Sequence, residues 1–238
     1  MKAFILAAGR GMRLRPFTDF HPKALTKVNG ISLLERNIRY LQSFGFQDFV
    51  INIHHFGNQI LDFLDAHDNF GSRIEISDET DSLLETGGGL VFARPFLDRG
   101  ESFLVMNVDI LTDLDIADFV RSHEENHRLV SLAVSDREGS RKLLFNHHKI
   151  LKGWMNEQTG EVRPHGLSEE VYEKLSFSGI HCIDPRFFSK IKRSGMFSIM
   201  EEYLDLVSTE EIYGYVHQAV LIDVGRASTV VEAEKYFK

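Results

Sequence analysis

The sequence predicts an α/β fold, in which a mixed, mostly parallel sheet is flanked by helices within a single domain. Over residues 1–135, short apolar runs of strand length alternate with segments whose apolar residues recur at helical spacing. Such alternation requires parallel crossover connections. The chain has 238 residues, of which 43% are hydrophobic, and this is enough to fill one large core.

The first half of the chain contains the regular alternation. "KAFILAA" (2–8) is a continuous apolar run that ends at a glycine, which is typical of a strand buried on both faces. Over 32–45 the apolar residues form one helical stripe, with Ser32 as the expected N-cap and Gly45 as the expected stop. The same patterns predict, in order, strand 48–53, helix 58–67, strand 73–77, a glycine turn entering a short helix at 86–94, strand 102–109, helix 114–126 and strand 129–135.

The second half, residues 136–238, is less regular and predicts a mixed sheet. The polar stretch 156–173 has the composition of a loop. The predicted elements around it are a hairpin of 142–146 and 148–155, a strand at 174–183, an amphipathic helix at 198–207, strands at 212–217 and 219–225, and a closing helix. We therefore expect one domain, 1–238, with a parallel half followed by a mixed half.

Charge and cysteine content exclude several classes of function. The chain carries 27 Lys and Arg against 35 Asp and Glu, a formal net charge of −8, which argues against a general nucleic-acid binder. Cys182 is the only cysteine, so a disulfide framework or a thiolate zinc cluster within the chain is excluded. No apolar run approaches the ~20 residues that span a bilayer, and the first run is shorter than a signal-peptide core of roughly 7–15 residues. We expect a cytoplasmic protein with no membrane partner.

The loop after the first predicted strand concentrates positive charge in an otherwise acidic chain. Gly9 and Gly11 would let the backbone approach a ligand closely and present N–H groups to anionic oxygens. Guanidinium groups suit phosphate because their donors are bidentate. The loop lacks the Gly-Lys-Ser/Thr ending of the Walker motif, and Leu14 takes the third glycine position of the dinucleotide fingerprint. The cations of this loop are Arg10, Arg13, Arg15 and Lys23.

The segment "HEENH" at 123–127 matches the zinc-peptidase pattern of two histidines four residues apart with a glutamate between them. Its neighbours are polar all round, and no third ligand is recognisable. Because so short a pattern arises easily by chance, we expect a solvated helix end here, with zinc hydrolysis as the minor alternative.

Five short motifs follow one another along nearly the whole chain: "LAAGRGMRLRPFTDFHPKAL" (6–25), "LETGGG" (84–89), "NVD" (107–109), "FSGI" (177–180) and "IDVG" (222–225). Together they resemble the sugar-1-phosphate nucleotidylyltransferases, whose signature loop reads Gly-x-Gly-x-x-Arg followed by Pro-Lys. The resemblance implies a Rossmann-like sheet of the nucleotide-diphospho-sugar transferase type. It also implies a nucleotide-binding half at 1–135 and a sugar-phosphate-binding half at 136–238, without the C-terminal hexapeptide-repeat domain of larger relatives.

This resemblance implies a reaction in which an NTP and a sugar 1-phosphate give an NDP-sugar and pyrophosphate, with Mg²⁺ as cofactor. The "ETGGG" run and the short length resemble members that use UTP and N-acetylmuramate 1-phosphate, an activity of cell wall recycling. GTP with mannose 1-phosphate, dTTP with glucose 1-phosphate and CTP with phosphocholine remain open, as does a catalytically silent homologue that senses nucleotide. The expected partners are these small molecules and no nucleic acid, and the expected state is a monomer or small homo-oligomer.

The resemblance also assigns roles to individual residues. Arg13 would hold the β- and γ-phosphates, and Lys23 would contact phosphate at the reaction centre. Asp109 and Asp223, each at the end of an apolar strand, would hold Mg²⁺ together with the substrate phosphates. The nucleotide would lie against Ala8, Gly9, Gly11, Thr86 and Gly87, and the sugar against Ser178 and Gly179.

Two features depart from the family pattern. Relatives carry Gly-Asp before the metal, whereas here the β-branched Val108 precedes Asp109, which could narrow the nucleotide or sugar site. The polar stretch 156–173 is longer than expected and is either a lid over the sugar site or an expanded surface loop. Both features bear on the choice of substrate more than on the class of reaction.

Overall fold

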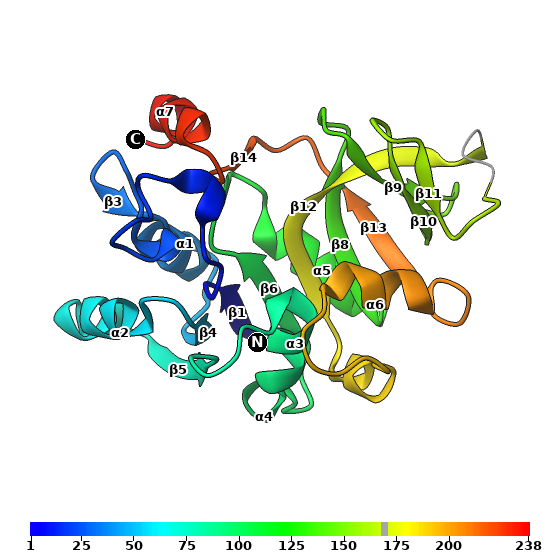
Figure 1. The fold of residues 1–238 in the computed structure, drawn as a ribbon. Coiled ribbons are helices and arrows are strands. Elements are labelled where there is room, and N and C mark those ends of the chain that lie inside the picture. Colours follow the sequence, from blue (N-terminus) through cyan, green and yellow to red (C-terminus); the bar gives the residue numbers. More distant parts are fainter. Residues whose placement is uncertain (168–170) are drawn as a thin grey trace.

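The computed structural model describes residues 1–167 and 171–238, and a ten-stranded mixed sheet runs through this part of the chain (Figure 1). Four neighbouring strands, in the spatial order β5–β4–β1–β6, are parallel. They are β1 (Lys2–Leu6), β4 (Asp48–Ile53), β5 (Arg73–Asp78) and β6 (Phe103–Asn107). The predicted α/β fold with a parallel first half is therefore confirmed.

The second half adds antiparallel strands to the same sheet, as predicted, and β8, the last strand of the first half, lies among them. β12 runs antiparallel to β6, to β8 and to β9, and β13 pairs in parallel with β8. The hairpin of β9 and β10 continues into β11. These strands are β8 (Val130–Ser135), β9 (Arg141–Phe145), β10 (Leu151–Asn156), β11 (Glu161–Arg163), β12 (Glu173–Ile183) and β13 (Ile212–Val216).

The stretch 156–173, predicted as a loop, contains the short strand β11. Trp154 to Asn156 of β10 pair with Glu161 to Arg163, so the loop turns back and completes the hydrogen bonding of an edge strand. The prediction was wrong here because this pairing is invisible in a polar composition. Residues 168–170 lie outside the described residues, so a lid formed by the whole stretch stays a prediction.

Helices cover both faces of the sheet because its strands are apolar on both sides. Along β1, Ala3 and Ile5 belong to the core that also contains α1, α2 and α5, whereas Phe4 belongs to the core beneath α3, α4 and α6. Ser32 caps α1 as predicted, since its Oγ accepts a hydrogen bond of 3.1 Å from the Glu35 amide. The helices are α1 (Leu33–Gln42), α2 (Gly57–Ala66), α3 (Glu85–Phe92), α4 (Arg94–Leu97), α5 (Ile116–Glu125), α6 (Ile199–Leu206) and α7 (Ala227–Tyr236). Among the described residues, none of the helices combines the length and the apolar character needed to cross a membrane.

The glycine run predicted as a turn lies inside helix α3. A Cβ at Gly87 would lie 2.3 Å from the Phe197 ring, and one at Gly88 would lie 2.2 Å from the Gly195 carbonyl oxygen. The glycines therefore let α3 pack directly on the segment that leads into α6. Their helical conformation was missed because glycine disfavours helix interiors, and tertiary packing overrides that preference here.

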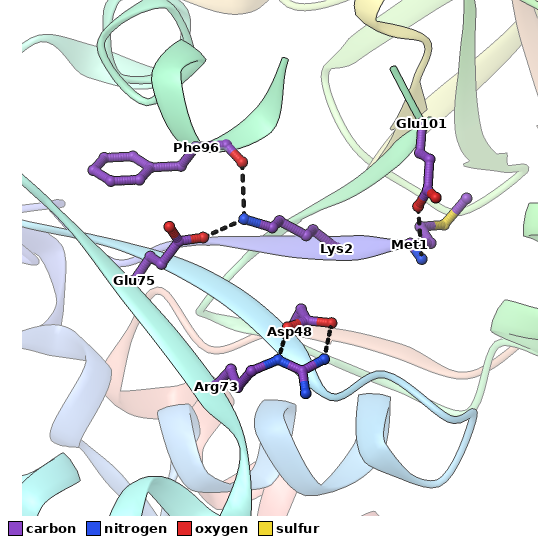
Figure 2. A network of polar contacts seen from close by, with 7 residues as sticks. All are labelled: Met1, Lys2, Asp48, Arg73, Glu75, Phe96 and Glu101. Atoms are coloured by element: carbon purple, nitrogen blue, oxygen red, sulfur yellow. Dashed lines mark hydrogen bonds and ion pairs between the residues drawn. The ribbon is translucent and has the colours of Figure 1, made fainter. Parts of the chain in front are cut away.

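The amino ends of the parallel strands carry mutually paired charges, at the edge away from the "LAAGRG" loop (Figure 2). Lys2, at the start of β1, pairs with Glu75 and donates to the Phe96 carbonyl at 3.0 Å. Arg73, at the start of β5, forms a two-point contact with Asp48, with one N–O distance of 2.6 Å. These cations are already neutralised by carboxylates, so this edge offers less to an anionic ligand than the opposite one.

The two histidines of "HEENH" are not on one helical face. His123 is buried within α5 and its Nδ1 lies 2.9 Å from Ser131 Oγ, whereas His127 lies beyond the end of that helix with a φ of +49°. The expected solvated helix end is therefore wrong for His123, which belongs to the interior. The burial of His123 against the sheet could not be predicted, because the residues around it in the sequence are polar.

Burial lowers the pKa of His123 from 6.5 to about 4, which makes stability depend on pH. As the pH falls through 6.5, the unfolded chain takes up a proton before the folded protein does, so stability is lost between about pH 6.5 and pH 4. We expect this residue to lower the free energy of unfolding by about 2 kcal/mol between pH 7 and pH 5. Urea unfolding of wild type and His123→Gln at both pH values measures it. An equal pH dependence in the two proteins would contradict the expectation.

Candidate active site

The candidate site lies at the carboxyl ends of β1 and β6, where ligands bind in open α/β sheets. The loop leaving β1 is compact, with two short 3-10 helices at Met12–Leu14 and Lys23–Leu25. Gly11 has a φ of +63°, and a Cβ there would lie 2.8 Å from Thr18 Cγ2 and 3.1 Å from Lys23 Cβ. Glycine at this position therefore lets the loop fold on itself and holds Lys23 close to its first turn.

Asp109 and Asp223 lie side by side although they are far apart in the sequence. A two-stranded sheet joins β7 (Ile110–Thr112) to β14 (Leu221–Asp223), and it places Asp223 opposite Ile110. The Val224 amide then donates to the Asp109 carbonyl at 2.8 Å. This pairing brings the two predicted carboxylates to one point at the edge of the sheet.

Two cations accompany these carboxylates. Lys23 forms an ion pair with Asp109, and both side chains are largely buried. A Cβ added at Gly225 would lie 2.7 Å from Asp223 Oδ1 and 3.4 Å from Arg13 Nη2, so the Arg13 guanidinium lies beside Asp223. The structure thus brings together Arg13, Lys23, Asp109 and Asp223.

The environment of Asp223 disfavours its charged form. Burial, followed by the negative charge of Asp109, raises the pKa of Asp223 above its usual range, while Lys23 and Arg13 oppose the shift. Its Oδ1 atom is buried and has no hydrogen-bond partner among the described residues. A buried, unpaired carboxylate oxygen is costly and indicates a ligand that binds there.

Two cavities meet at this group of residues. The first, about 330 Å³, is lined by Ala8, Gly9, Lys23, Thr86 and Asp109 among the predicted residues, and also by Val108. The second is a groove of about 790 Å³ whose lining includes Arg13 and Asp223. Ser198, the N-cap of α6, lines both. We call them the first cavity and the groove.

A buried polar pair in the first cavity was missed from the sequence. Asn52 Oδ1 accepts from the Ala7 and Ala8 amides at 2.6 and 3.2 Å, and Asn52 Nδ2 donates to Glu79 Oε1 at 2.7 Å. Glu79 is only 3% exposed, and burial raises its pKa while Asn52 opposes the shift. Through these hydrogen bonds Asn52 fixes the backbone where the first loop begins. The one signal for it in the sequence was a polar residue inside the apolar run "DFVINI".

Arg137 is a second residue that sequence reasoning missed. It lines the groove, its Nη2 donates to the Phe177 carbonyl at 2.7 Å, and its Nε is buried without a partner in the described part of the chain. Burial lowers the pKa of Arg137, and the nearby Asp223 carboxylate opposes the shift. An isolated arginine after a strand carries no motif, so only the fold reveals its position.

Some predicted contact residues do not line either cavity. Gly11 and Gly87 serve the packing described above, and a Cβ at Gly179 (φ +73°) would lie 2.8 Å from Ile110 Cγ1. Ser178 is fully buried, with its Oγ 2.8 Å from His217 Nε2. Contacts of these residues with substrate therefore stay predictions without geometric support.

The Ser178–His217 pair is not a nucleophile with its base. The Ala219 amide donates to His217 Nδ1 at 3.2 Å, so Nδ1 is the unprotonated nitrogen and Nε2–H donates to the serine. Burial, followed by the positive charge of Arg137, lowers the pKa of His217. The imidazole therefore cannot take the serine proton, and the serine has no activating base.

The mixed sheet, with two cavities meeting at the carboxyl ends of its parallel strands, defines an α/β protein of the nucleotide-diphospho-sugar transferase fold. Residues 2–142 match the family model described as nucleotidyl transferase. The chain belongs to this family, which confirms the resemblance found in its motifs.

Individual relatives cover almost the whole chain. An N-acetylmuramate alpha-1-phosphate uridylyltransferase from Neisseria meningitidis serogroup B is 33% identical over 98% of this chain and 97% of the relative. The mannose-1-phosphate guanylyltransferase catalytic subunit beta of Dictyostelium discoideum is 26% identical over 95% of this chain, which spans 61% of that relative. The crystal structure of HddC from Yersinia pseudotuberculosis complexed with GMP-PN covers 100% of this chain and 99% of its own, with a TM-score of 0.79 and 21% identity. At that identity the likeness establishes the shared fold.

Proposed function

We propose that this protein is a sugar-1-phosphate nucleotidylyltransferase that joins UTP and a sugar 1-phosphate to give a UDP-sugar and pyrophosphate. The observation that carries the proposal is the meeting of Asp109, Asp223, Arg13 and Lys23 where the two cavities join. The first cavity is lined mostly from 1–135 and the groove mostly from 136–238, which supports a nucleotide-binding half and a sugar-phosphate-binding half. Because UTP is a cytoplasmic metabolite, the proposal includes a cytoplasmic reaction.

The proposed reaction needs charge neutralisation more than acid–base catalysis. The attacking group is a phosphate oxygen whose second pKa is about 6, so it is ionised at neutral pH without a general base. The protein must align two polyanions against their mutual repulsion and stabilise the negative charge that develops on the leaving pyrophosphate. A site built from cations and a carboxylate pair, with no activated serine, supports this chemistry.

The residues at the junction fit a divalent cation such as Mg²⁺. The Asp223 Oδ1 atom has no partner, and Gly225 leaves open the space that a Cβ would fill beside it. Within the described residues no group of three or more acidic, histidine or cysteine side chains gathers here, so phosphate oxygens and water would complete the coordination shell. Asp109 and Asp223 would hold the ion, which supplies positive charge that offsets the repulsion between the phosphates.

Three cations would position the phosphates. Arg13 reaches the junction from the loop after β1 and would bind the outgoing pyrophosphate. Lys23 is paired with Asp109, so its ammonium is held within reach of a phosphate at the same point. The unpaired Nε of Arg137 would donate to the phosphate of the sugar.

Glu79 supports UTP over CTP. Burial disfavours the ionised form of Glu79, but the hydrogen bonds that it accepts from Asn52 Nδ2 and from the Leu84 amide favour that form. An ionised carboxylate offers only acceptors, which suit the N3–H of uracil and oppose the N3 lone pair of cytosine. The same argument permits GTP and dTTP, whose bases also carry a ring N–H. The relatives named above, a uridylyltransferase and a guanylyltransferase, agree with this preference.

Replacing Glu79 by glutamine is expected to weaken the preference for UTP over CTP by about tenfold or more, because the amide can donate to cytosine N3. Asn52 keeps its acceptor, so the loop it supports stays in place. Affinities of both nucleotides for wild type and Glu79→Gln, measured by calorimetry, give the result. Asp81→Asn, an exposed change in the same loop, serves as the control. An unchanged ratio of the two affinities would rule out contact between Glu79 and the base.

The experiment that tests the proposed function is pyrophosphate release from a matrix of nucleotides and sugar 1-phosphates, with and without EDTA. We expect release from UTP with N-acetylmuramate 1-phosphate, and its loss in EDTA. GTP with mannose 1-phosphate, dTTP with glucose 1-phosphate and CTP with phosphocholine form the other cells of the matrix. Tight UTP binding with no release from any pair would instead indicate a nucleotide-sensing protein.

A further inference from the structure

The floor of the groove is one face of the three-stranded edge formed by β9, β10 and β11. Residues directly opposite each other on antiparallel strands share a face. The pairings place Arg141, Asn156 and Glu161 in one row and Leu143, Trp154 and Arg163 in the next. All six line the groove, facing Met200, Glu201 and Leu204 of α6. The residues of this face are far in the sequence from Arg13 and Lys23, the predicted catalytic residues.

The second row provides an aromatic surface with a neutralised cation beside it. The Arg163 guanidinium lies 5.6 Å from the Trp154 ring centroid, and it also pairs with Glu161 at 2.6 Å. Trp154 is half-buried, so part of its indole faces the groove. Indole offers a flat apolar surface to a ring-shaped ligand, and Asn156 and Glu161 offer polar groups to hydroxyls.

Arg141 is the remaining cation of this floor, and its charge is not neutralised. In residues 1–167 and 171–238, its guanidinium forms neither an ion pair nor a hydrogen bond with another side chain. Two exposed arginines elsewhere, Arg39 and Arg121, each pair with a carboxylate on their own helix, and Arg94 pairs with the residue that follows α4. Glu138 lines the same groove but does not pair with Arg141. The groove therefore presents a free planar donor on the side of Trp154 away from Arg163.

We propose that Arg141 is the residue that selects a sugar 1-phosphate with an acidic substituent, by binding the carboxylate that the sugar carries. This inference rests on the proposed function, because it takes the groove as the sugar-phosphate site. The phosphate is held at the end near Arg13 and Arg137, and the sugar ring lies against Trp154. A guanidinium binds a carboxylate through two parallel hydrogen bonds, whereas a neutral sugar offers the guanidinium no charged partner.

The test uses three substrates that share one hexosamine core: N-acetylmuramate 1-phosphate, its lactyl methyl ester, and N-acetylglucosamine 1-phosphate. For the wild type, kcat/KM with UTP is expected to be about 10- to 100-fold higher for the free acid than for the ester. Arg141→Gln is expected to remove most of that preference by slowing the acid alone, and Arg141→Lys to restore part of it. Arg99→Gln, which changes an exposed arginine outside the groove, should leave every rate unchanged.

Calorimetry of the acid and the ester with the wild type and Arg141→Gln adds a reading that does not depend on turnover. An acid-to-ester affinity ratio that is unchanged in Arg141→Gln overturns the inference. So does a wild type that binds the ester as tightly as the acid. Turnover of the neutral substrates alone would sustain the proposed function while overturning the acidic-substrate class. Absence of turnover with all three, despite tighter binding of the acid, would overturn the proposed function and leave the Arg141 contact intact.

Discussion

Replacing Asp109 or Asp223 by asparagine is expected to lower turnover on the order of 10³-fold or more, because each variant removes half of the carboxylate pair. The pairing of β7 with β14 brings the two side chains together. Among the described residues no third carboxylate joins them, so none could replace a lost aspartate. Pyrophosphate release at saturating UTP and Mg²⁺ measures the effect. The control is Asp136→Asn, which changes an exposed aspartate in the loop after β8 and should retain wild-type rates.

The Asp223→Asn variant also separates loss of catalysis from loss of folding. Burial and the charge of Asp109 raise the pKa of Asp223, so its ionisation destabilises the metal-free fold at neutral pH. The amide removes that charge, and we expect the melting temperature in EDTA to rise by about 2–4 °C for each 1 kcal/mol gained. A variant that unfolds more easily, or one that keeps near-normal turnover, would contradict the role of Asp223.

Lys23→Gln is expected to lower turnover by about 10²- to 10³-fold, because a charged donor at the reaction centre is lost. Lys23 pairs with Asp109, so it competes with a divalent cation for that carboxylate. Removal of the lysine should therefore leave Mn²⁺ affinity unchanged or increased while turnover falls. Single-turnover kinetics and Mn²⁺ titration, in parallel, measure the two quantities.

Lys27→Gln is the matched control, because Lys27 is exposed, lies four residues further along the chain in the short strand β2 (Lys27–Val28) and lines neither cavity. It should retain wild-type turnover. If Lys23→Gln lost Mn²⁺ binding together with turnover, its effect would come from damage to the carboxylate pair, and a direct contact with phosphate would be excluded.

The features that could be predicted are those that depend on a short stretch of sequence. The apolar run of β1 and the glycine-rich loop after it predict a parallel strand followed by an anion site, and Ser32 predicts the start of α1. The same pattern places Asp109 near the carboxyl end of β6, and it lies in the turn that follows this strand. Its proximity to Asp223 does not follow from that pattern, because the pairing of β7 with β14 joins segments over a hundred residues apart, and only the family resemblance indicated it.

The features missed depend on tertiary contacts. The glycines of α3 are required by its packing, because side chains at Gly87 and Gly88 would clash with Phe197 and Gly195 and one at Gly89 with Glu79. Strand β11 forms because β10 offers an open edge. Arg137 and Glu79 stand alone in the sequence, without a motif, and gain meaning only from the cavities they line. Neither Arg137 nor Glu79 therefore had a local signal in the sequence.

The most direct measurement is a crystal structure of the protein with Mn²⁺ and a non-hydrolysable UTP analogue, with the metal located by its anomalous scattering. We expect a Mn²⁺ peak bound by a carboxylate oxygen from both Asp109 and Asp223, with the triphosphate reaching Arg13 and Lys23 and the base beside Glu79. A metal bound away from either aspartate, or a triphosphate bound away from Arg13 and Lys23, would contradict the account.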